Sequence, residues 1–274
     1  MLVTAKWILD KALEEGGYAV IAPNANVEFY ARAAVEAAEE CHTAVILDIN
    51  YPQIEDMVGY GRLLERIAME SSAPVAIQQD HGGKFDQAIW AIRSGYSSVM
   101  ADRSELPYEQ NVAEVAEIVK IAHAVGVSVE GEIGHVGMNE DAESIAAGLV
   151  DPAVAKDYVE RTGVDALAVA IGTTHGTYKG TPHLDFDLLA KCREAVSIPL
   201  VLHGASGTGD ELLAQAARSG IQKINVCTEL QENCAAKWNE AGITDAGHGF
   251  RLLRAGYKEK VVHYMHVFGQ VDKF

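Results

Sequence analysis

The sequence predicts an α/β fold in which eight parallel strands, each followed by a helix, close into one barrel. Three observations support this prediction. Short apolar runs alternate eight times with longer segments of helical periodicity along the 274 residues. The apolar runs are continuous rather than alternating, which is typical of parallel strands buried on both faces. One such barrel needs about 250 residues, so we expect a single (β/α)8 domain, a TIM barrel, over residues 1–274.

The expected strands are 18–23, 44–49, 74–77, 98–102, 127–133, 166–171, 199–202 and 223–226. The expected helices of the eight units are 27–40, 53–69, 86–94, 109–125, 151–162, 185–195, 210–219 and 230–241. Four helical segments are followed by glycines suited to a left-handed cap, namely Gly95, Gly126, Gly163 and Gly220. We also expect a helix over 4–15 that plugs the bottom of the barrel and a closing helix over 250–268.

A doubly wound open sheet is the alternative architecture. It would contain fewer strands and usually a glycine fingerprint after the first one. Here the first expected strand ends in Pro23-Asn24-Ala25-Asn26, which is no such fingerprint. The barrel is therefore the better prediction.

Composition excludes several classes of partner. The net charge of −17 and the pI near 4.9 argue against nucleic acid or an anionic membrane surface as the main partner. No apolar run approaches the 18 residues of a membrane span. The four cysteines are scattered, without metal-type pairing, and no signal peptide is recognisable. We therefore expect reduced thiols and a cytoplasmic protein.

Three histidines follow expected strands in matching settings. They are His81, His175 and His203, and Asp80 stands directly beside the first of them. One histidine at a strand end is usually a hydrogen-bonded structural residue. Three at the same end of a barrel would meet, and three neutral imidazoles with an open fourth position suit catalytic zinc.

Other residues of ligand or acid–base type also stand at or near the expected strand ends. They are Asn50, Asp102, Glu130, Glu132, Asn225 and Thr228. A random soluble surface would favour Lys and Glu instead. The polar ring at the carboxyl ends of the strands therefore predicts the active site.

Two turns favour binding of a phosphate group. Gly204-Ala205-Ser206-Gly207 would let backbone N–H groups and a hydroxyl approach an anion. Asn225-Val226-Cys227-Thr228 opens the last helix of the barrel, where a helix N-terminus favours negative charge. Gly176 and Lys179, just after the second histidine, complete the expected phosphate site.

These residues make the chain similar to class II, zinc-dependent fructose-bisphosphate and tagatose-bisphosphate aldolases along nearly its whole length. The segments that carry the resemblance are 80–82, 98–104, 127–134, 161–172, 175–176, 199–207 and 223–226. The resemblance implies zinc held by His81, His175 and His203. It also implies that Glu132 contacts an alternative metal position and that Asp102 orients a metal-binding histidine.

The implied reaction is reversible aldol cleavage of a ketose phosphate or bisphosphate into dihydroxyacetone phosphate and an aldehyde. By resemblance, Asp80 is the general acid and base on the hydroxyl that becomes the aldehyde, and Glu140 helps to handle the carbon-bound proton. The phosphate-binding segments match Gly176, Gly204, Ala205, Ser206, Asn225, Val226, Cys227 and Thr228. The family also suggests a bound monovalent cation, a dimer or tetramer, and a role in carbohydrate metabolism such as glycolysis.

Departures from the family pattern cluster on the half of the mouth expected to hold the aldehyde. Gln78-Gln79 replaces a common His-Leu, Gly83 replaces a polar residue, and Asn50-Tyr51-Pro52 replaces a Ser-Pro-Gly-like turn. Asn24-Ala25-Asn26 replaces the usual Phe-Asn. Two other functions stay open at this point: a metal-dependent phosphosugar epimerase or isomerase, and a catalytically inactive sugar-phosphate binding protein.

Overall fold

A computed structural model describes residues 1–50, 56–138, 142–176, 181–242 and 245–274. The described residues form one eight-stranded sheet in the order β1-β8-β7-β6-β5-β4-β3-β2, and every ladder in it is parallel. Its strands are β1 (Val20–Pro23), β2 (Val45–Asn50), β3 (Val75–Asp80), β4 (Ser98–Ala101), β5 (Ser128–Ile133), β6 (Ala166–Val169), β7 (Leu200–Leu202) and β8 (Lys223–Val226). All eight predicted strands are confirmed.

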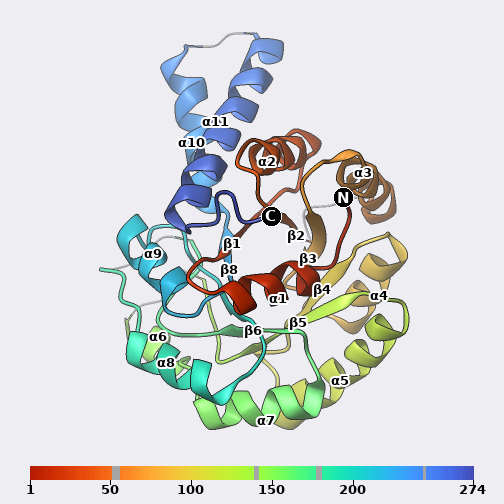
Figure 1. Ribbon diagram of the computed structural model, residues 1–274, viewed down its shortest axis with the longest axis vertical. Helices are drawn as coiled ribbons and strands as arrows, with labels where there is room; N and C mark the ends of the chain where they lie inside the picture. The colour runs from red at the N-terminus through yellow and green to blue at the C-terminus, as the bar shows by residue number, and fades with distance from the viewer. Residues whose placement is uncertain (51–55, 139–141, 177–180, 243–244) are drawn as a thin grey trace.

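Most of the helices surround this sheet as an outer ring, whereas α1 crosses its centre (Figure 1). The helices are α1 (Ala5–Glu15), α2 (Glu28–Glu40), α3 (Met57–Glu70), α4 (Phe85–Arg93), α5 (Tyr108–Ala124), α6 (Ala142–Ala147), α7 (Pro152–Thr162), α8 (Phe186–Ala195), α9 (Asp210–Arg218), α10 (Thr228–Glu240) and α11 (Ala246–Val267). The (β/α)8 barrel is therefore confirmed. No helix within the described ranges is long and apolar enough to cross a membrane.

The side chains along each strand alternate between two apolar environments. On β2, Leu47 packs in the outer core between strands and helices, whereas Ile46 packs in a separate inner cluster. Because side chains of a strand point alternately to its two faces, Asp48 and Asn50 lie on the same inward face as Ile46. By the same alternation, His203 lies on the inward face just after β7, above Val201. Inward residues near the carboxyl ends of the strands therefore build the site.

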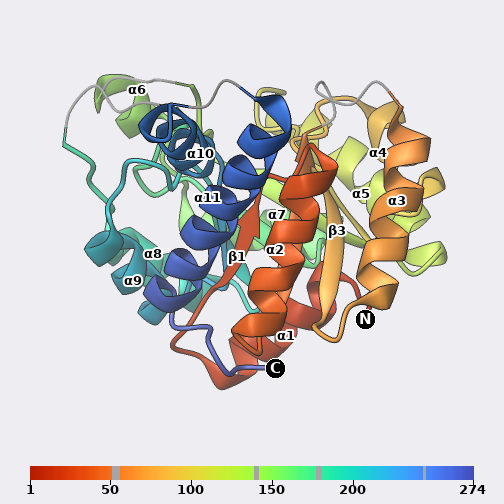
Figure 2. The same ribbon diagram turned by 90° about the horizontal axis from the view of Figure 1, so that it is seen from above.

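The lower end of the barrel is plugged by α1, as the sequence predicted. This helix crosses the centre of the ring in Figure 1, and it lies at the end where both chain termini lie in Figure 2. Ile8 and Leu9 are fully buried in the inner cluster. The first N–H groups of the helix donate to strand hydroxyls, Ala5 N to Ser98 Oγ at 2.7 Å and Lys6 N to Ser128 Oγ at 3.4 Å.

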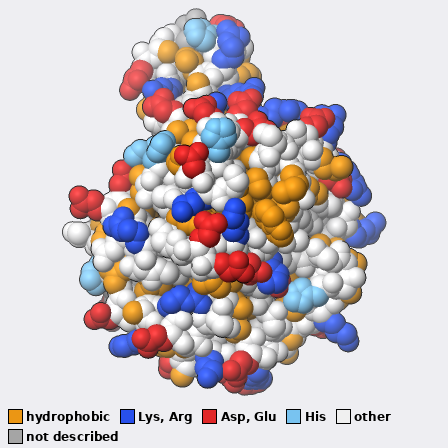
Figure 3. Space-filling model, in the orientation of Figure 1, with side chains coloured by type: hydrophobic (Ala, Val, Ile, Leu, Met, Phe, Trp, Pro, Cys, Tyr) orange, Lys and Arg blue, Asp and Glu red, His pale blue; other side chains and the backbone are white. Residues whose placement is uncertain are grey.

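The outer surface around α1 carries acidic and basic side chains interspersed with apolar ones (Figure 3). This mixture shows no large field of a single sign on that face.

The barrel closes between β1 and β2 with little ladder pairing. An isolated bridge joins Asn24 to Asp48. Lower down, the side chain of Gln270 lies in the seam: Ile21 N donates to its Oε1 at 2.6 Å, and its Nε2 donates to Ala44 O at 3.0 Å. A side chain from beyond the last helix thus supplies hydrogen bonds that a strand ladder would otherwise make.

The sequence misplaced the C-terminal helix and missed one short helix. α11 begins at Ala246 rather than at residue 250, with the Asp245 side chain accepting from Gly247 N and His248 N. Gly249 lies inside this first part of the helix, and a Cβ there would lie 1.8 Å from Trp238 of α10, so the close approach of the two helices requires glycine. α10 and α11 pair and extend outward beyond the ring of helices (Figure 1). The missed helix is α6.

The four predicted cap glycines all have positive φ, between 72° at Gly163 and 111° at Gly220. Gly163 is the left-handed cap of α7, and its N–H donates to Val159 O. L residues with a side chain are strained in this region, so these predictions are confirmed.

Candidate active site

A pocket of about 440 Å³ opens at the carboxyl ends of the strands. It collects most of the predicted site residues, although they come from five separate parts of the chain. Those that line it are Asp80, His81, Asp102, His175, Gly176, His203, Gly204, Ala205, Ser206, Asn225, Val226, Cys227 and Thr228. Glu132 is buried beside the pocket without lining it, and Glu140 and Lys179 lie outside the described residues.

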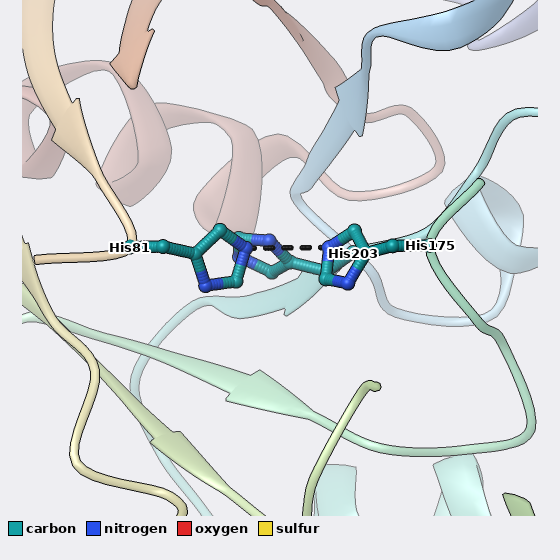
Figure 4. A group of neighbouring side chains, drawn as sticks. All are labelled: His81, His175 and His203. Atoms are coloured by element: carbon teal, nitrogen blue, oxygen red, sulfur yellow. Dashed lines mark hydrogen bonds between the residues drawn. The ribbon is translucent and has the colours of Figure 1, made fainter. Parts of the chain in front are cut away.

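The three predicted histidines meet at one point in this pocket (Figure 4). His81 follows β3, His175 follows β6 and His203 follows β7. The Nε2 atoms of His81 and His175 are 3.2 Å apart. The ring centroid of His203 is 4.7 Å from that of His81 and 5.9 Å from that of His175. The three rings present nitrogen atoms to a common volume, as metal ligands do.

Each of these imidazoles is held through one nitrogen, so the other is available to a metal. His81 Nδ1 contacts Asp102 Oδ2 at 2.8 Å, and His175 Nδ1 donates to Val136 O at 2.9 Å. His203 uses Nε2 instead, which lies 2.8 Å from Glu130 Oε1. Its Nδ1 is buried with no hydrogen-bond partner among the described residues. Oriented histidines with one unused nitrogen fit a divalent metal such as zinc.

The charges around the histidines also fit a cation. Burial lowers the pKa of His175 to about 3 and also lowers that of His203, so both stay neutral as ligands must be. Burial acts in the same direction on His81, but the charge of Asp80 and the hydrogen bond to Asp102 outweigh it and raise its pKa to about 10. The carboxylates that attract this proton would equally stabilise a metal ion.

Glu132 forms a second possible ligand group with His81 and Asp102. Its Oε1 accepts from Val136 N at 3.2 Å, whereas its Oε2 is buried without a partner in the described parts of the chain. Burial, reinforced by the charge of Asp102, raises the pKa of Glu132 to about 8. A buried carboxyl with an unused oxygen beside a histidine is compatible with the predicted alternative metal position.

A charged layer lies directly beneath the histidines, and of its charged members the sequence analysis had named only Glu130. Lys223 of β8 is fully buried, and its Nζ lies 2.9 Å from Glu130 Oε2 and 3.4 Å from Asp48 Oδ2. Gln78 Nε2 donates to Glu130 Oε2 at 2.9 Å. Because Glu130 also holds His203, a chain of contacts connects the buried lysine to a predicted metal ligand.

The pKa values of the two buried carboxyl groups, Glu130 and Asp48, are shifted in opposite directions. Burial disfavours the charge of Glu130, but Lys223 and the hydrogen bond from His203 outweigh it and lower its pKa to about 2. At Asp48 burial dominates over the attraction of Lys223, and its pKa rises well above the usual range. In the sequence, this layer is indicated by charged residues that stand inside otherwise apolar strands.

Asp80 lies between the histidines and the side-chain amide of Asn225. Its Oδ1 is 3.8 Å from His81 Nε2 and accepts from Asn225 Nδ2 at 3.2 Å. The same Asn225 amide donates to Asp48 Oδ2 at 2.5 Å. Asp80 therefore stands next to the predicted metal position with its carboxylate oriented by an amide, in a place suited to proton transfer.

The two predicted phosphate-binding turns lie side by side in the pocket. Gly204 has a φ of 70°, and a Cβ there would lie 2.7 Å from Thr174 O, so only glycine permits this turn. Ser206 Oγ accepts from Glu229 N at 3.3 Å, and Gly207 N donates to Glu229 Oε1 at 2.7 Å. These contacts join the turn to the first residues of α10, whose N-terminus opens into the pocket.

Comparison with known proteins agrees with this geometry. The model of the family "Fructose-bisphosphate aldolase class-II" matches residues 3–273. The YdjI aldolase from Escherichia coli K12 is 32% identical in sequence, with 99% of this chain and 98% of that chain covered and a TM-score of 0.90. The fructose-bisphosphate aldolase of Campylobacter jejuni is 19% identical over 100% of this chain and 97% of that chain, with a TM-score of 0.83, and supports the fold.

The family match covers nearly every residue and includes all the segments that form the pocket. Class II aldolases are typically metal-dependent, and the three converging histidines offer a metal site. The chain therefore belongs to the class II fructose-bisphosphate aldolase family and is an aldolase, a lyase that cleaves carbon–carbon bonds.

Proposed function

We propose that this aldolase is zinc-dependent and reversibly cleaves a ketose phosphate or bisphosphate into dihydroxyacetone phosphate and an aldehyde. The observation that carries the proposal is the convergence of three oriented imidazoles beside Asp80, in one pocket with the two turns that we expect to bind a phosphate group. His81, His175 and His203 would hold the metal. When bound, zinc would supply a Lewis acid that polarises the substrate carbonyl.

The phosphate group would be bound by the turns after β7 and β8. The residues available there are Gly204, Ala205, Ser206 and 225–228, with Gly176 on the neighbouring loop. Backbone N–H groups at the start of α10 favour a negative charge through the helix dipole. This site would fix one end of the ketose, so that its carbonyl faces the histidines.

Asp80 would remove the proton from the hydroxyl that becomes the aldehyde. The adjacent carbon–carbon bond then breaks, and its electron pair stays on the dihydroxyacetone phosphate fragment. That fragment regains a proton at carbon, a step in which we expect Glu140 to take part. In the direction of condensation the same groups act in reverse order, so Asp80 returns the proton to the new hydroxyl.

Several further features stay predictions. Asp102 would keep His81 in the orientation that presents Nε2, and Glu132 would serve an alternative metal position. Lys179 is predicted to complete the phosphate site. A bound monovalent cation, a dimer or tetramer, a place in glycolysis or related sugar metabolism, and a cytoplasmic location are predicted in the same way.

The decisive experiment incubates the zinc-loaded protein with fructose 1,6-bisphosphate, tagatose 1,6-bisphosphate and ketose 1-phosphates. Release of dihydroxyacetone phosphate, abolished by a chelator and restored by zinc, is the expected result. Formation of one isomerised six-carbon product would instead indicate an epimerase or isomerase. Failure to release the triose phosphate from every member of the panel would refute the proposed reaction.

A further inference from the structure

The two sides of the pocket differ in charge. The side formed by the turns after β7 and β8 presents backbone amides and hydroxyls. The β1–β2 side and the outer rim present Asn24, Asp48, Asn50 and Glu105. Among the described residues, the lining of the whole pocket contains no Lys or Arg.

Asp48 contributes a buried carboxyl group to the lining of the pocket. The residue is only 1% exposed, it lines the pocket, and its inward direction follows from its register on β2. Its Oδ2 accepts from Asn225 Nδ2 at 2.5 Å and lies 3.4 Å from Lys223 Nζ. Its Oδ1 is buried and has no hydrogen-bond partner in the described part of the molecule. A buried acceptor without a partner is costly unless a ligand satisfies it.

Asn24 presents a second acceptor of this kind nearby. It is 7% exposed, lines the pocket, and its Oδ1 also lacks a partner among the described residues. Its main chain is fixed from two sides, because Tyr257 Oη donates to Asn24 O at 2.8 Å and Ala25 N donates to Asp48 O at 2.8 Å. The turn is further held by Tyr60 Oη, which donates to Ala25 O at 2.5 Å. These two acceptors are therefore preorganised.

Arg103 and Arg254 make their contacts outside the pocket. Arg103 is buried behind the pocket, where its guanidinium donates to Glu114 Oε2 at 2.8 Å and to Gly82 O. Arg254 of α11 forms an ion pair with Glu36. Neither side chain lines the pocket, so neither provides a cation for a second phosphate group there.

We propose that the aldehyde half of the substrate is an uncharged polyol, with its hydroxyls donating to Asp48 Oδ1 and Asn24 Oδ1. The preferred substrates are then ketose 1-phosphates without a second phosphate or a carboxylate, and Asp48 determines this preference. Buried acceptors match hydroxyl donors, whereas a second anionic group would lose its solvation without meeting a Lys or Arg in the described lining. This inference rests on the proposed release of dihydroxyacetone phosphate.

The test compares two aldehydes in the condensation direction. The zinc-loaded protein receives dihydroxyacetone phosphate with either glyceraldehyde or glyceraldehyde 3-phosphate, and kcat/KM is measured for each. We expect a preference for the uncharged aldehyde of at least about tenfold, since unmatched buried polar groups discriminate strongly between substrates. Equal use of the two aldehydes, or preference for the phosphorylated one, would overturn the inference.

A variant that removes the acceptor tests the role of Asp48. In Asp48→Ala the uncharged aldehyde loses a hydroxyl acceptor, so the ratio of the two kcat/KM values should fall about tenfold, toward equal use of both aldehydes. Comparing both aldehydes in one protein cancels any general loss of activity. The matched control is Asp10→Ala, which removes a carboxyl group from the Lys6–Asp10 pair on α1 and should leave the ratio unchanged. An unchanged ratio in Asp48→Ala would show that this residue does not set the preference.

A partial reaction separates this inference from the proposed function. Without any aldehyde, the protein should exchange a carbon-bound proton of dihydroxyacetone phosphate with deuterated solvent. Exchange together with preference for glyceraldehyde 3-phosphate would refute only the uncharged substrate. Absence of both exchange and condensation would refute the proposed function, and this inference with it.

Discussion

The lower and upper parts of the barrel interior are lined by the same strands but contain opposite kinds of side chain. Below, Ile46 and Val201 pack against Ile8 and Leu9 of α1 in an apolar cluster. Above, on the same inward faces, stand charged and polar groups such as Asp48. Several of their atoms lack hydrogen-bond partners in the described structure, including Asp48 Oδ1, Glu132 Oε2 and His203 Nδ1.

This difference separates stability from function within one fold. A buried polar atom without a partner costs about 1–3 kcal/mol, whereas burial of an aliphatic side chain contributes about 1.5–3 kcal/mol. The lower cluster and the outer core therefore stabilise a barrel whose mouth is not optimised for stability. Changes at the mouth should mainly alter chemistry, and changes at the bottom should mainly alter the free energy of unfolding.

The largest effect is expected for His203→Ala. Loss of one of three imidazoles should weaken zinc binding by more than about 100-fold, because even residues that only support a ligand are worth 10- to 100-fold. Zinc content after dialysis and the rate of aldol cleavage should fall together. The matched control is His266→Ala on the exposed surface of α11, which should keep both. Full zinc content in His203→Ala would contradict the assigned ligand set.

Asp80→Asn should separate turnover from metal binding. We expect kcat to fall by about 10²- to 10⁴-fold, the usual contribution of a general acid and base. Zinc content should stay at the wild-type level, because the three imidazoles are intact. Metal analysis and steady-state kinetics on the same sample check both parts. Wild-type turnover in this variant would remove Asp80 from the mechanism.

Leu9→Ala tests the other end of the barrel. Truncating this fully buried side chain should lower the free energy of unfolding by about 2–5 kcal/mol. The kcat at 25 °C should remain unchanged, since α1 lies at the end opposite the pocket. Leu13→Ala on the same helix is the control, and it should cost less because that side chain is only partly buried. A large loss of kcat in Leu9→Ala would contradict the separation of stability at the lower end from catalysis at the mouth.

A further effect of comparable size is a pH dependence of stability in the metal-free protein. Burial raises the pKa of Glu132 to about 8 from a usual value of 4.5. Between these values the folded protein holds a proton that the unfolded chain has released, so stability falls as pH rises, by up to about 1.4 kcal/mol per pH unit. Glu132→Gln should lack this contribution. Denaturant unfolding of both proteins from pH 5 to 8 measures the free energy of unfolding. The same pH dependence in the two proteins would contradict the assigned role of Glu132.

Much of the fold could be predicted because its signals are local. Eight apolar runs and the glycines after helices depend on neighbouring residues, and the strands and caps were confirmed. The start of α11 could not be predicted, because Gly249 is explained only by Trp238 from another helix. α6 was missed as well, since its six residues are too few for a clear helical periodicity.

The site was predictable where residues stand at strand ends. His81, His175, His203 and Asp80 were recognised there and do meet in one pocket. Asp48 and Lys223 were overlooked, because continuous apolar runs hide which positions face the interior. Only the register of the closed sheet shows that these two side chains meet inside the barrel. The roles of Glu140 and Lys179 stay predictions.

The hydrogen bonds of Gln270 have a consequence for the order of assembly during synthesis. This residue joins Ile21 of the first strand to Ala44 just before the second, yet it leaves the ribosome after all eight strands. A nascent chain can pair its strands in sequence, but the gap between the first two stays without this side chain until the segment after α11 has been made. Closure of the barrel is thereby coupled to synthesis of a segment that follows all eight strands, and a chain truncated before Gln270 should collapse into an open and protease-sensitive sheet.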